Sequence, residues 1–261
     1  MIDKSLLVRV FGHTATFFHS DTMVIDRWLW LKKKLPITKD KETLIDIGCG
    51  SGAFTIGSAK RGYKSLGLSW DKRNQNVAEE RSVICNTHNT KYETYDVRKL
   101  EDRSDLHEKF NIAICVEVIE HIIDDQKLFR EIVKCIKPGG RLLLTAPYYD
   151  GSPFVNDDIG PFDQEEEDGN HVRKGYTKGM LLELCNDSNL ILEEVSYCSG
   201  FFSQIITGFL RFLEVNINPM LAWLIVLPLR IIPLIFDKPI SKIFNWSGYS
   251  ICMEAYKPKQ Q

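Results

Sequence analysis

The sequence predicts an α/β fold, a Rossmann-like, seven-stranded, mostly parallel sheet with helices on both faces and an antiparallel last strand. Two observations predict this fold. From Thr43 onward, short apolar runs alternate with amphipathic stretches, a pattern that indicates a parallel sheet covered by helices. A glycine-rich loop follows the first of these runs and comes directly before a helical stretch, as in folds that bind a ligand at a helix N-terminus.

Each expected strand is a short apolar run, and each expected helix is an amphipathic stretch. The strands are expected at 43–47, 65–68, 91–95, 112–116, 141–146, 190–198 and 249–256. The core helices are expected at 54–60, 71–86, 124–136 and 177–187. Within 124–136, Leu128, Phe129, Ile132 and Val133 share one face, which is typical of a helix packed on a sheet.

We expect four segments along the chain. Residues 1–42 form an N-terminal lid with a helix over 21–34, and residues 43–198 form the α/β core. Residues 199–248 form an apolar cap insertion, because they are too many for a tight connection and too apolar for a disordered one. Residues 249–261 supply the closing strand of the core and a tail.

Composition limits which binding partners and which cellular compartment we expect. The 33 Lys and Arg against 35 Asp and Glu give a net charge of -2, so no nucleic-acid partner is expected. The seven cysteines contain no Cys-x-x-Cys pair and are expected to be reduced. The N-terminus lacks an uninterrupted apolar core with a cleavage site, so we expect a cytoplasmic protein.

The glycine loop from Asp46 to Gly52 is the most informative segment. Glycines let the backbone turn sharply and approach a ligand, and the following helix offers unpaired N–H groups. Gly48, Gly50 and Ala53 also fit the looser dinucleotide fingerprint, which is the competing interpretation. Asp46 favours a cofactor with an ammonium group, because a carboxylate would repel a pyrophosphate.

This loop resembles the first motif of the class I S-adenosylmethionine methyltransferases, in particular their ubiquinone-type O-methyltransferase branch. Two further motifs support the resemblance, Cys115-Val-Glu-Val-Ile-Glu-His121 and Lys137-Pro-Gly-Gly-Arg141. The likeness runs from about 42 to 148 and is weaker over 171–199. It implies a methyltransferase core over 43–198 and S-adenosylmethionine as the cofactor.

The resemblance also implies a set of cofactor-binding residues. These are Asp46, Gly48, Cys49, Gly50, Gly52, Ser69, Trp70, Asp71, Asp96, Val97, Val116 and Glu117. Most relatives hold the ribose hydroxyls with an acidic residue where this chain has Ser69, so either Ser69 makes a weaker contact or Asp71 reaches back. Trp70 either stacks near the adenine or is a hydrophobic plug at a helix start.

The sulfonium of this cofactor is a strong methyl donor, so the protein need only align a nucleophile and exclude water. A hydroxyl acceptor would benefit from a general base, and His121 and His171 are the catalytic candidates. The alternative for each is a structural histidine. An acidic run over 157–168 could bind a cation, but dense like charge favours a solvated loop, so no metal site is predicted.

The segment 201–236 is more apolar than a cap requires. Such a surface meets the core, an apolar acceptor, a partner chain or a membrane interface. Its prolines and Arg230 argue against a spanning helix. We expect an enzyme that methylates the hydroxyl of an apolar, lipid-like or isoprenoid-bearing small molecule, with peripheral contact to the inner face of the membrane or a homo-oligomer through 201–236.

Two alternative functions stay open at this point. An N- or C-methyltransferase of a natural product or sugar would use the same cofactor site. A nonenzymatic cofactor-binding or assembly protein is the alternative of another class, and the intact glycine loop argues against it.

Overall fold

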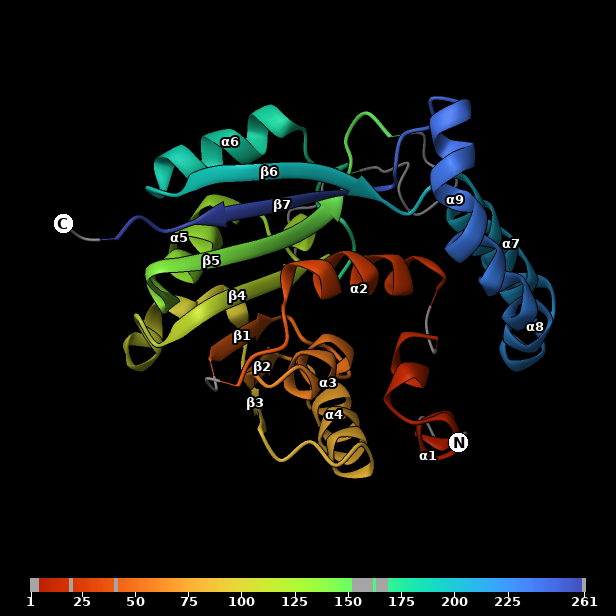
Figure 1. The fold of residues 1–261 in the computed structure, drawn as a ribbon, viewed down its shortest axis with the longest axis horizontal. Helices are drawn as coiled ribbons and strands as arrows, with labels where there is room; N and C mark the ends of the chain where they lie inside the picture. The colour runs from red at the N-terminus through yellow and green to blue at the C-terminus, as the bar shows by residue number, and fades with distance from the viewer. Residues whose placement is uncertain (1–4, 19–20, 40–41, 152–161, 163–168, 260–261) are drawn as a thin grey trace.

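The computed structural model describes residues 5–18, 21–39, 42–151, 162 and 169–259, and these form an α/β fold around one sheet (Figure 1). The strands are β1 Thr43–Ile47, β2 Lys64–Ser69, β3 Thr90–Thr94, β4 Phe110–Val116, β5 Ile136–Pro147, β6 Ile191–Cys198 and β7 Ser250–Tyr256. The seven strands lie in the order β3-β2-β1-β4-β5-β7-β6. Only β7 runs antiparallel to its neighbours, so the predicted fold class is confirmed.

Helices cover both faces of the sheet. The α-helices are α1 Leu6–Phe11, α2 Met23–Lys34, α3 Ala53–Lys60, α4 Lys72–Ile84, α5 Asp125–Cys135, α6 Lys178–Asp187, α7 Phe201–Asn216, α8 Pro219–Val226 and α9 Ile231–Ile243. The short 3-10 helices are η1 His13–Phe17, η2 Val97–Asp102, η3 Ser104–Leu106, η4 Ile119–His121 and η6 Leu227–Arg230. Side chains of α5 and α6 pack on one face of the sheet, and those of α2 and η1 pack on the other.

One boundary differs from the sequence-based expectation in an informative way. The sequence predicts that the fifth strand begins at residue 141, after a Pro-Gly-Gly stretch, but β5 already begins at Ile136. The backbone near the C-terminus explains the difference, because Gly139 N donates to Lys257 O and Lys257 N donates to Gly140 O, each over 2.8 Å. Pairing with a segment distant in the sequence therefore makes a strand of residues whose local sequence favours a turn.

The cap consists of the helices α7 to α9, which follow β6 and lie beyond the end of the sheet (Figure 1). A small cluster of buried side chains, Ile206, Leu210, Ala222 and Val226, holds α7 against α8. Asp237 of α9 accepts hydrogen bonds from Phe202 N at 2.6 Å and Gly200 N at 3.1 Å, and so caps the start of α7. These contacts make the three helices one unit.

The run Pro219–Ile243 of the cap is one helical stretch of 25 residues that is long and apolar enough to cross a membrane. Its Arg230, however, is 1% exposed and donates to the carbonyl of Phe18 at 2.6 Å. Trp223 donates to the same carbonyl at 2.9 Å. The charged residue that argued against a spanning helix is thus bound to the N-terminal part of the protein.

Candidate active site

The glycine loop connects β1 to α3 and has positive φ angles that residues with a side chain rarely adopt. Gly48, Gly50 and Gly52 have φ angles of 76°, 50° and 79°. A Cβ on Gly48 would lie 2.4 Å from a methyl group of Val118. The nitrogens of Gly48 and Cys49 both donate to Leu68 O at 2.9 Å, which ties the loop to the end of β2. The loop is therefore shaped by requirements that only glycine meets at these positions.

Asp46 and Cys49 belong to this loop region but point into the protein. Asp46 is 1% exposed and accepts a 2.6 Å hydrogen bond from the Thr55 hydroxyl. Burial raises the pKa of Asp46 to about 7. Cys49 lies under the loop and accepts from Gln75 Nε2 at 3.3 Å. Both side chains are therefore buried beneath the loop and hydrogen-bonded to α3 and α4 in this structure.

A cavity of about 470 Å³ opens beside the loop, at the carboxyl ends of β1, β2 and β4. Its lining residues are Gly48, Gly50, Ser69, Trp70, Asp71, Asn74, Asp96, Val97, Arg98, Glu117, Val118, His121, Ile122 and Gly169. Eight of the twelve expected cofactor residues and the candidate base His121 are among them. A glycine-walled hollow at this edge of a parallel sheet fits a nucleoside cofactor, because the backbone there can approach a ligand closely.

The remaining expected residues lie elsewhere for packing reasons. A Cβ on Gly52 would meet Ala78 at 2.8 Å, so this glycine faces α4 instead of the cavity. Val116 is 8% exposed and belongs to the apolar core under α2. Asp46 and Cys49 are buried below the loop, as described above. His171 contacts His121 and is not among the residues that line the cavity.

The end of β2 carries the residues whose roles the sequence left open. Ser69, Trp70 and Asp71 all line the cavity. Trp70 is 69% exposed, which rules out a hydrophobic plug and leaves an indole at the rim. Asp71 caps α4 by accepting from Arg73 N at 2.8 Å, so its second carboxylate oxygen is the one available to a ligand.

Asp96 and Glu117 are the acidic residues on the other sides of the cavity. Arg98 donates to both carboxylate oxygens of Asp96, and these hydrogen bonds lower the pKa of that carboxyl group. Glu117 directly follows β4 and has a positive φ of 51°, and its Oε2 lies 3.0 Å from a guanidinium nitrogen of Arg27. Its Oε1 accepts from Thr145 and Ser250 at 2.8 and 3.0 Å. Arg27 thus links α2 to the cofactor edge.

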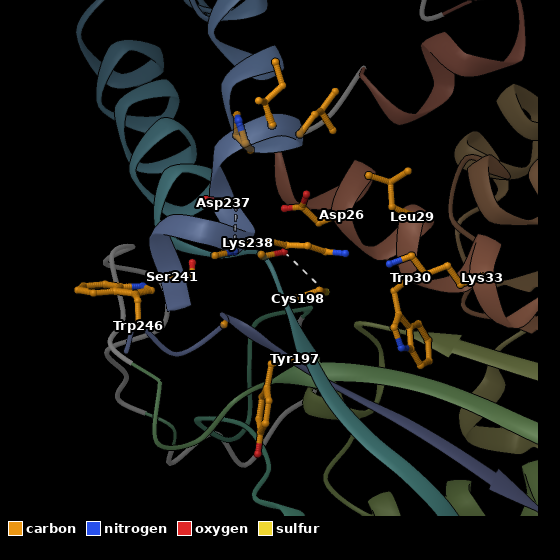
Figure 2. Close-up of a pocket in the computed structure, with 16 residues that line it drawn as sticks. Asp26, Leu29, Trp30, Lys33, Tyr197, Cys198, Asp237, Lys238, Ser241 and Trp246 are labelled. Atoms are coloured by element: carbon orange, nitrogen blue, oxygen red, sulfur yellow. Dashed lines mark hydrogen bonds between the residues drawn. The ribbon is translucent and has the colours of Figure 1, made fainter. Parts of the chain in front are cut away.

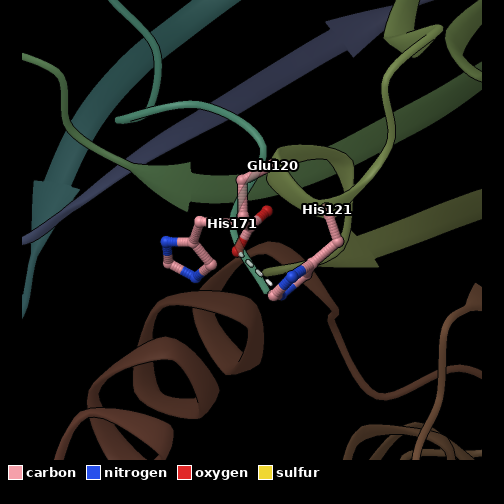
Figure 3. Close-up of side chains that lie close together, drawn as sticks. All are labelled: Glu120, His121 and His171. Carbon is pink, nitrogen blue, oxygen red and sulfur yellow. Dashed lines mark ion pairs between the residues drawn. The ribbon is translucent and has the colours of Figure 1, made fainter. Parts of the chain in front are cut away.

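His121 and His171 come from separate segments and meet at this edge (Figure 3). Their rings are 4.7 Å apart between centroids, and Glu120 lies beside them with a fully buried side chain. His121 Nδ1 contacts the backbone carbonyl of Asn170 at 3.1 Å. Burial and, to a smaller extent, the neighbouring His121 lower the pKa of His171 to about 4, so its ring is neutral at physiological pH.

Five lining residues were not expected from the sequence. They are Asn74, Arg98, Val118, Ile122 and Gly169. Asn74 lies three residues after the helix cap Asp71 and so shares its side of α4, which is a signal that helical spacing could have revealed. Gly169 comes from a segment about fifty residues further along the chain than the others, and only the tertiary fold brings it to the cavity.

A second cavity of about 500 Å³ lies between α2, the end of β6 and α9 (Figure 2). Aromatic side chains of Trp30, Tyr197 and Trp246 line it, and Figure 2 shows Lys33 and Lys238 reaching towards each other across it. The proximity of Lys238 lowers the pKa of Lys33. Asp26 and Asp237 also line this cavity, which therefore combines aromatic side chains with basic and acidic groups.

The acidic run over 157–168, for which the sequence left open a solvated loop or a cation site, lies outside the described residues except for Phe162.

The chain matches known methyltransferases over most of its core. A family model described as a methyltransferase domain matches residues 25–194. The ubiquinone biosynthesis O-methyltransferase of Hydrogenovibrio crunogenus is 30% identical over 105 residues, which are 39% of this chain and 41% of that protein. The chain thus matches less than half of the length of this relative.

Solved structures show the same fold at low identity. Phosphoethanolamine N-methyltransferase 2 of Haemonchus contortus, in complex with S-adenosyl-L-methionine, aligns with a TM-score of 0.63 at 17% identity, covering 99% of this chain and 61% of that one. The [4+2]-cyclase SpnF aligns with a TM-score of 0.60 at 17% identity, covering 91% and 83%. The chain therefore belongs to the methyltransferase domain family, with the class I fold and S-adenosylmethionine as its cofactor.

Proposed function

We propose that the protein transfers the methyl group of S-adenosylmethionine to the hydroxyl of an apolar, lipid-like acceptor, which it takes from a membrane surface. The observation that carries this proposal is the exposed apolar face of the cap. β6 runs parallel to β5 and ends at Cys198, and α7 begins at Phe201. The cap is therefore attached at the same edge of the sheet as the cofactor cavity.

Exposed apolar side chains occur along all three helices of the cap. They are Ile205, Phe209, Phe212, Val215, Ile217, Met220, Leu221, Leu224, Ile225, Ile231, Leu234, Ile235, Phe236, Ile243 and Phe244. A patch of this kind exceeds the scattered apolar residues of an ordinary surface and is typical of a binding surface. Amphipathic helices with such a face lie in the membrane interface, where acyl chains cover the apolar side.

The contacts of the cap favour peripheral binding over insertion across the bilayer. Arg230 and Trp223 bind the carbonyl of Phe18, and Asp237 caps α7. Crossing a bilayer would break these hydrogen bonds and place Arg230 in lipid, which costs about 2.5 kcal/mol or more. We therefore propose that the cap rests on the inner face of the membrane while the core stays in the cytoplasm.

The chemistry at the cofactor edge requires few side chains. The sulfonium supplies an activated methyl group when the cofactor is bound, and the protein aligns the acceptor oxygen with it and excludes water. Glycines of the loop would hold the methionine part, and Asp71, Ser69 and Asp96 would hold the nucleoside part. The cavity between α2 and α9, which has both aromatic and charged lining residues, offers space of about 500 Å³ for part of an acceptor or a lipid.

A pair of acceptors tests this proposal directly. One is a phenol with a long alkyl chain presented in phospholipid vesicles, and the other is the same phenol without the chain in solution. The cap variant replaces Phe209, Phe212 and Val215 with Ser. Its matched control replaces Ile37 and Val83 with Ser, and these two are exposed apolar residues outside the cap. Rates of methyl transfer and vesicle flotation are measured for both.

We expect the cap variant to lose vesicle binding and turnover of the long-chain phenol, by roughly a hundredfold if each lost side chain contributes about 1 kcal/mol. Its affinity for S-adenosylmethionine and its rate with the short phenol should stay unchanged. The control should behave as the wild type. If the cap variant still floats with vesicles and methylates the long-chain phenol normally, the membrane part of the proposal is wrong.

A further inference from the structure

The guanidinium group of Arg230 is buried without a carboxylate partner. Arg230 belongs to η6 and is 1% exposed. Its Nη1 donates to the carbonyl of Phe18 at 2.6 Å, but its Nε and Nη2 have no hydrogen-bond partner among the described residues. No ion pair within that part of the chain includes Arg230. A permanent positive charge and two of its three donor nitrogens are therefore uncompensated.

A charge in this position is unfavourable for the folded protein. Burial lowers the pKa of Arg230, and the acidic residues that oppose this effect, Asp21 and Glu214, form no ion pair with it among the described residues. An arginine side chain nevertheless stays protonated in proteins, so burial does not remove the charge. A bound water molecule would satisfy the N–H groups without neutralising them. An anion would do both, because it accepts hydrogen bonds and carries the opposite charge.

Two buried hydroxyl groups lie on elements that adjoin η6. Thr22 directly precedes α2 and is 1% exposed, and Thr207 on α7 is 0% exposed. Neither hydroxyl has a hydrogen-bond partner within the described part of the chain. Helix α7 packs against both α2 and η6. Three neighbouring elements therefore bring donors without partners to the junction between the cap and the N-terminal part of the protein.

The surroundings of this junction are apolar. The central carbon of the Arg230 guanidinium lies 5.7 Å from the ring centre of Trp223. Leu229 and Ile232 pack against the buried cluster of the cap, and Ile231, directly after Arg230, is 56% exposed. A free inorganic ion gains nothing from such surroundings. An apolar chain attached to the anion would be covered by them and would strengthen binding.

We propose that Arg230 binds an oxyanion, a phosphate or carboxylate group, at the end of an apolar molecule. A guanidinium group suits both kinds of anion, because its planar set of N–H groups can donate to two oxygens at once. If this molecule is the acceptor, which rests on the proposed function, the acceptor is a lipid-like molecule with a negatively charged group in addition to its hydroxyl. Binding of the oxyanion itself does not rest on the proposed function.

Binding is measured without turnover, so its failure and the failure of the proposed function are distinguishable. The full chain is titrated in a calorimeter with octyl phosphate, octanoate, inorganic phosphate or the uncharged octyl glucoside. The variants are Arg230→Met, which removes the charge, and Arg230→Lys, which keeps it. The matched control is Lys242→Met, which removes one exposed positive charge from the same cap. The Tm of each variant, with and without octyl phosphate, shows whether it folds.

We expect octyl phosphate and octanoate to bind more tightly than inorganic phosphate or octyl glucoside, and octyl phosphate to raise the Tm of the wild type. Arg230→Met should lose affinity for octyl phosphate by at least about tenfold and lose the shift in Tm. Arg230→Lys should keep part of both, and Lys242→Met should behave as the wild type. Wild-type protein that binds neither octyl phosphate nor octanoate would overturn the proposal, and so would a folded Arg230→Met variant with wild-type affinity.

Turnover tests whether the oxyanion belongs to the acceptor. The wild type should methylate a long-chain phenol that carries a carboxylate faster than the same phenol without it, and Arg230→Met should remove this preference. An Arg230→Met variant that binds octyl phosphate weakly but keeps the preference would show that the oxyanion is not part of the acceptor. Intact binding of octyl phosphate without methylation of either phenol would count against the proposed function alone.

Discussion

The glycine loop and the apolar cap lie at the same edge of the sheet, yet their sequences are constrained in different ways. In the loop, Gly48 has a φ of 76° and no room for a Cβ, so the backbone dictates the residue. On the cap, residues such as Phe212 and Val215 are 61% and 87% exposed, and any apolar side chain would serve. The cofactor side therefore depends on residue identity at single positions, whereas the proposed acceptor side depends on composition.

The largest effect is expected where the two regions are joined. Arg27 on α2 pairs with Glu117 of the cavity and donates to Ser250 beside the cap, and its side chain is 8% exposed. Arg27→Met leaves a carboxylate without its partner and should lower the free energy of unfolding by about 3 kcal/mol or more. Urea denaturation measures this change in the free energy of unfolding. Arg9→Met, which breaks the exposed Arg9–Glu80 pair, should change stability by at most about 1 kcal/mol.

The next prediction concerns the loop alone. Gly48→Ala should weaken binding of S-adenosylmethionine by roughly a hundredfold, or about 2.7 kcal/mol, because the new methyl group collides with Val118 and strains the backbone. Calorimetry checks this value. Gly12→Ala has a similar positive φ of 71° but open space around it, and should leave cofactor affinity unchanged. Equal losses in both variants would contradict the argument from the loop.

A smaller effect concerns pH and the second cavity. Burial raises the pKa of Asp26 to about 7 from 3.8 in the unfolded chain. Between about pH 4 and pH 7 the folded state therefore keeps this proton, whereas the unfolded state has released it. The free energy of unfolding consequently falls as the pH rises through this range. Asp26→Asn lacks this dependence.

We expect the Tm of Asp26→Asn minus that of the wild type to increase by several degrees between pH 5 and 8, since about 1 kcal/mol shifts Tm by roughly 2–4 °C in a chain of this size. Calorimetric scans at several pH values measure it, with the exposed Asp187→Asn as the control. A difference in Tm that does not vary with pH would show that Asp26 is ionised normally.

The smallest effect is expected at the rim of the cofactor cavity. Trp70 is 69% exposed, so Trp70→Ala should leave the free energy of unfolding unchanged within about 0.5 kcal/mol. If its indole stacks on the adenine, cofactor affinity should fall about fivefold, or about 1 kcal/mol. Unchanged affinity would place the adenine elsewhere in the cavity.

Local signals made the cofactor edge predictable from the sequence. The strand, the three glycines and the helix start lie within about twenty consecutive residues, and each has its own physical requirement. The alternation of apolar runs and amphipathic helices likewise predicted the sheet, because its period is local. The side-chain direction of Asp46 was not predictable, since it depends on how Thr55 of α3 packs against β1.

Long-range contacts account for what the sequence could not show. The pairing of His121 with His171 and the arrival of Gly169 at the cavity depend on a connection of about fifty residues. The early start of β5 depends on Lys257, more than a hundred residues away. The composition of the cap indicated an apolar surface, but its attachment through Arg230 to Phe18 needed the folded structure.

Transfer of label from methyl-labelled S-adenosylmethionine distinguishes a lipid-like acceptor from a polar one. The protein is incubated with a lipid extract and, separately, with an extract of polar metabolites from the same cells. We expect label to enter the lipid fraction and both Gly48→Ala and the cap variant to reduce it. Label that enters only polar metabolites, at a rate the cap variant does not change, would show that the acceptor is not lipid-like.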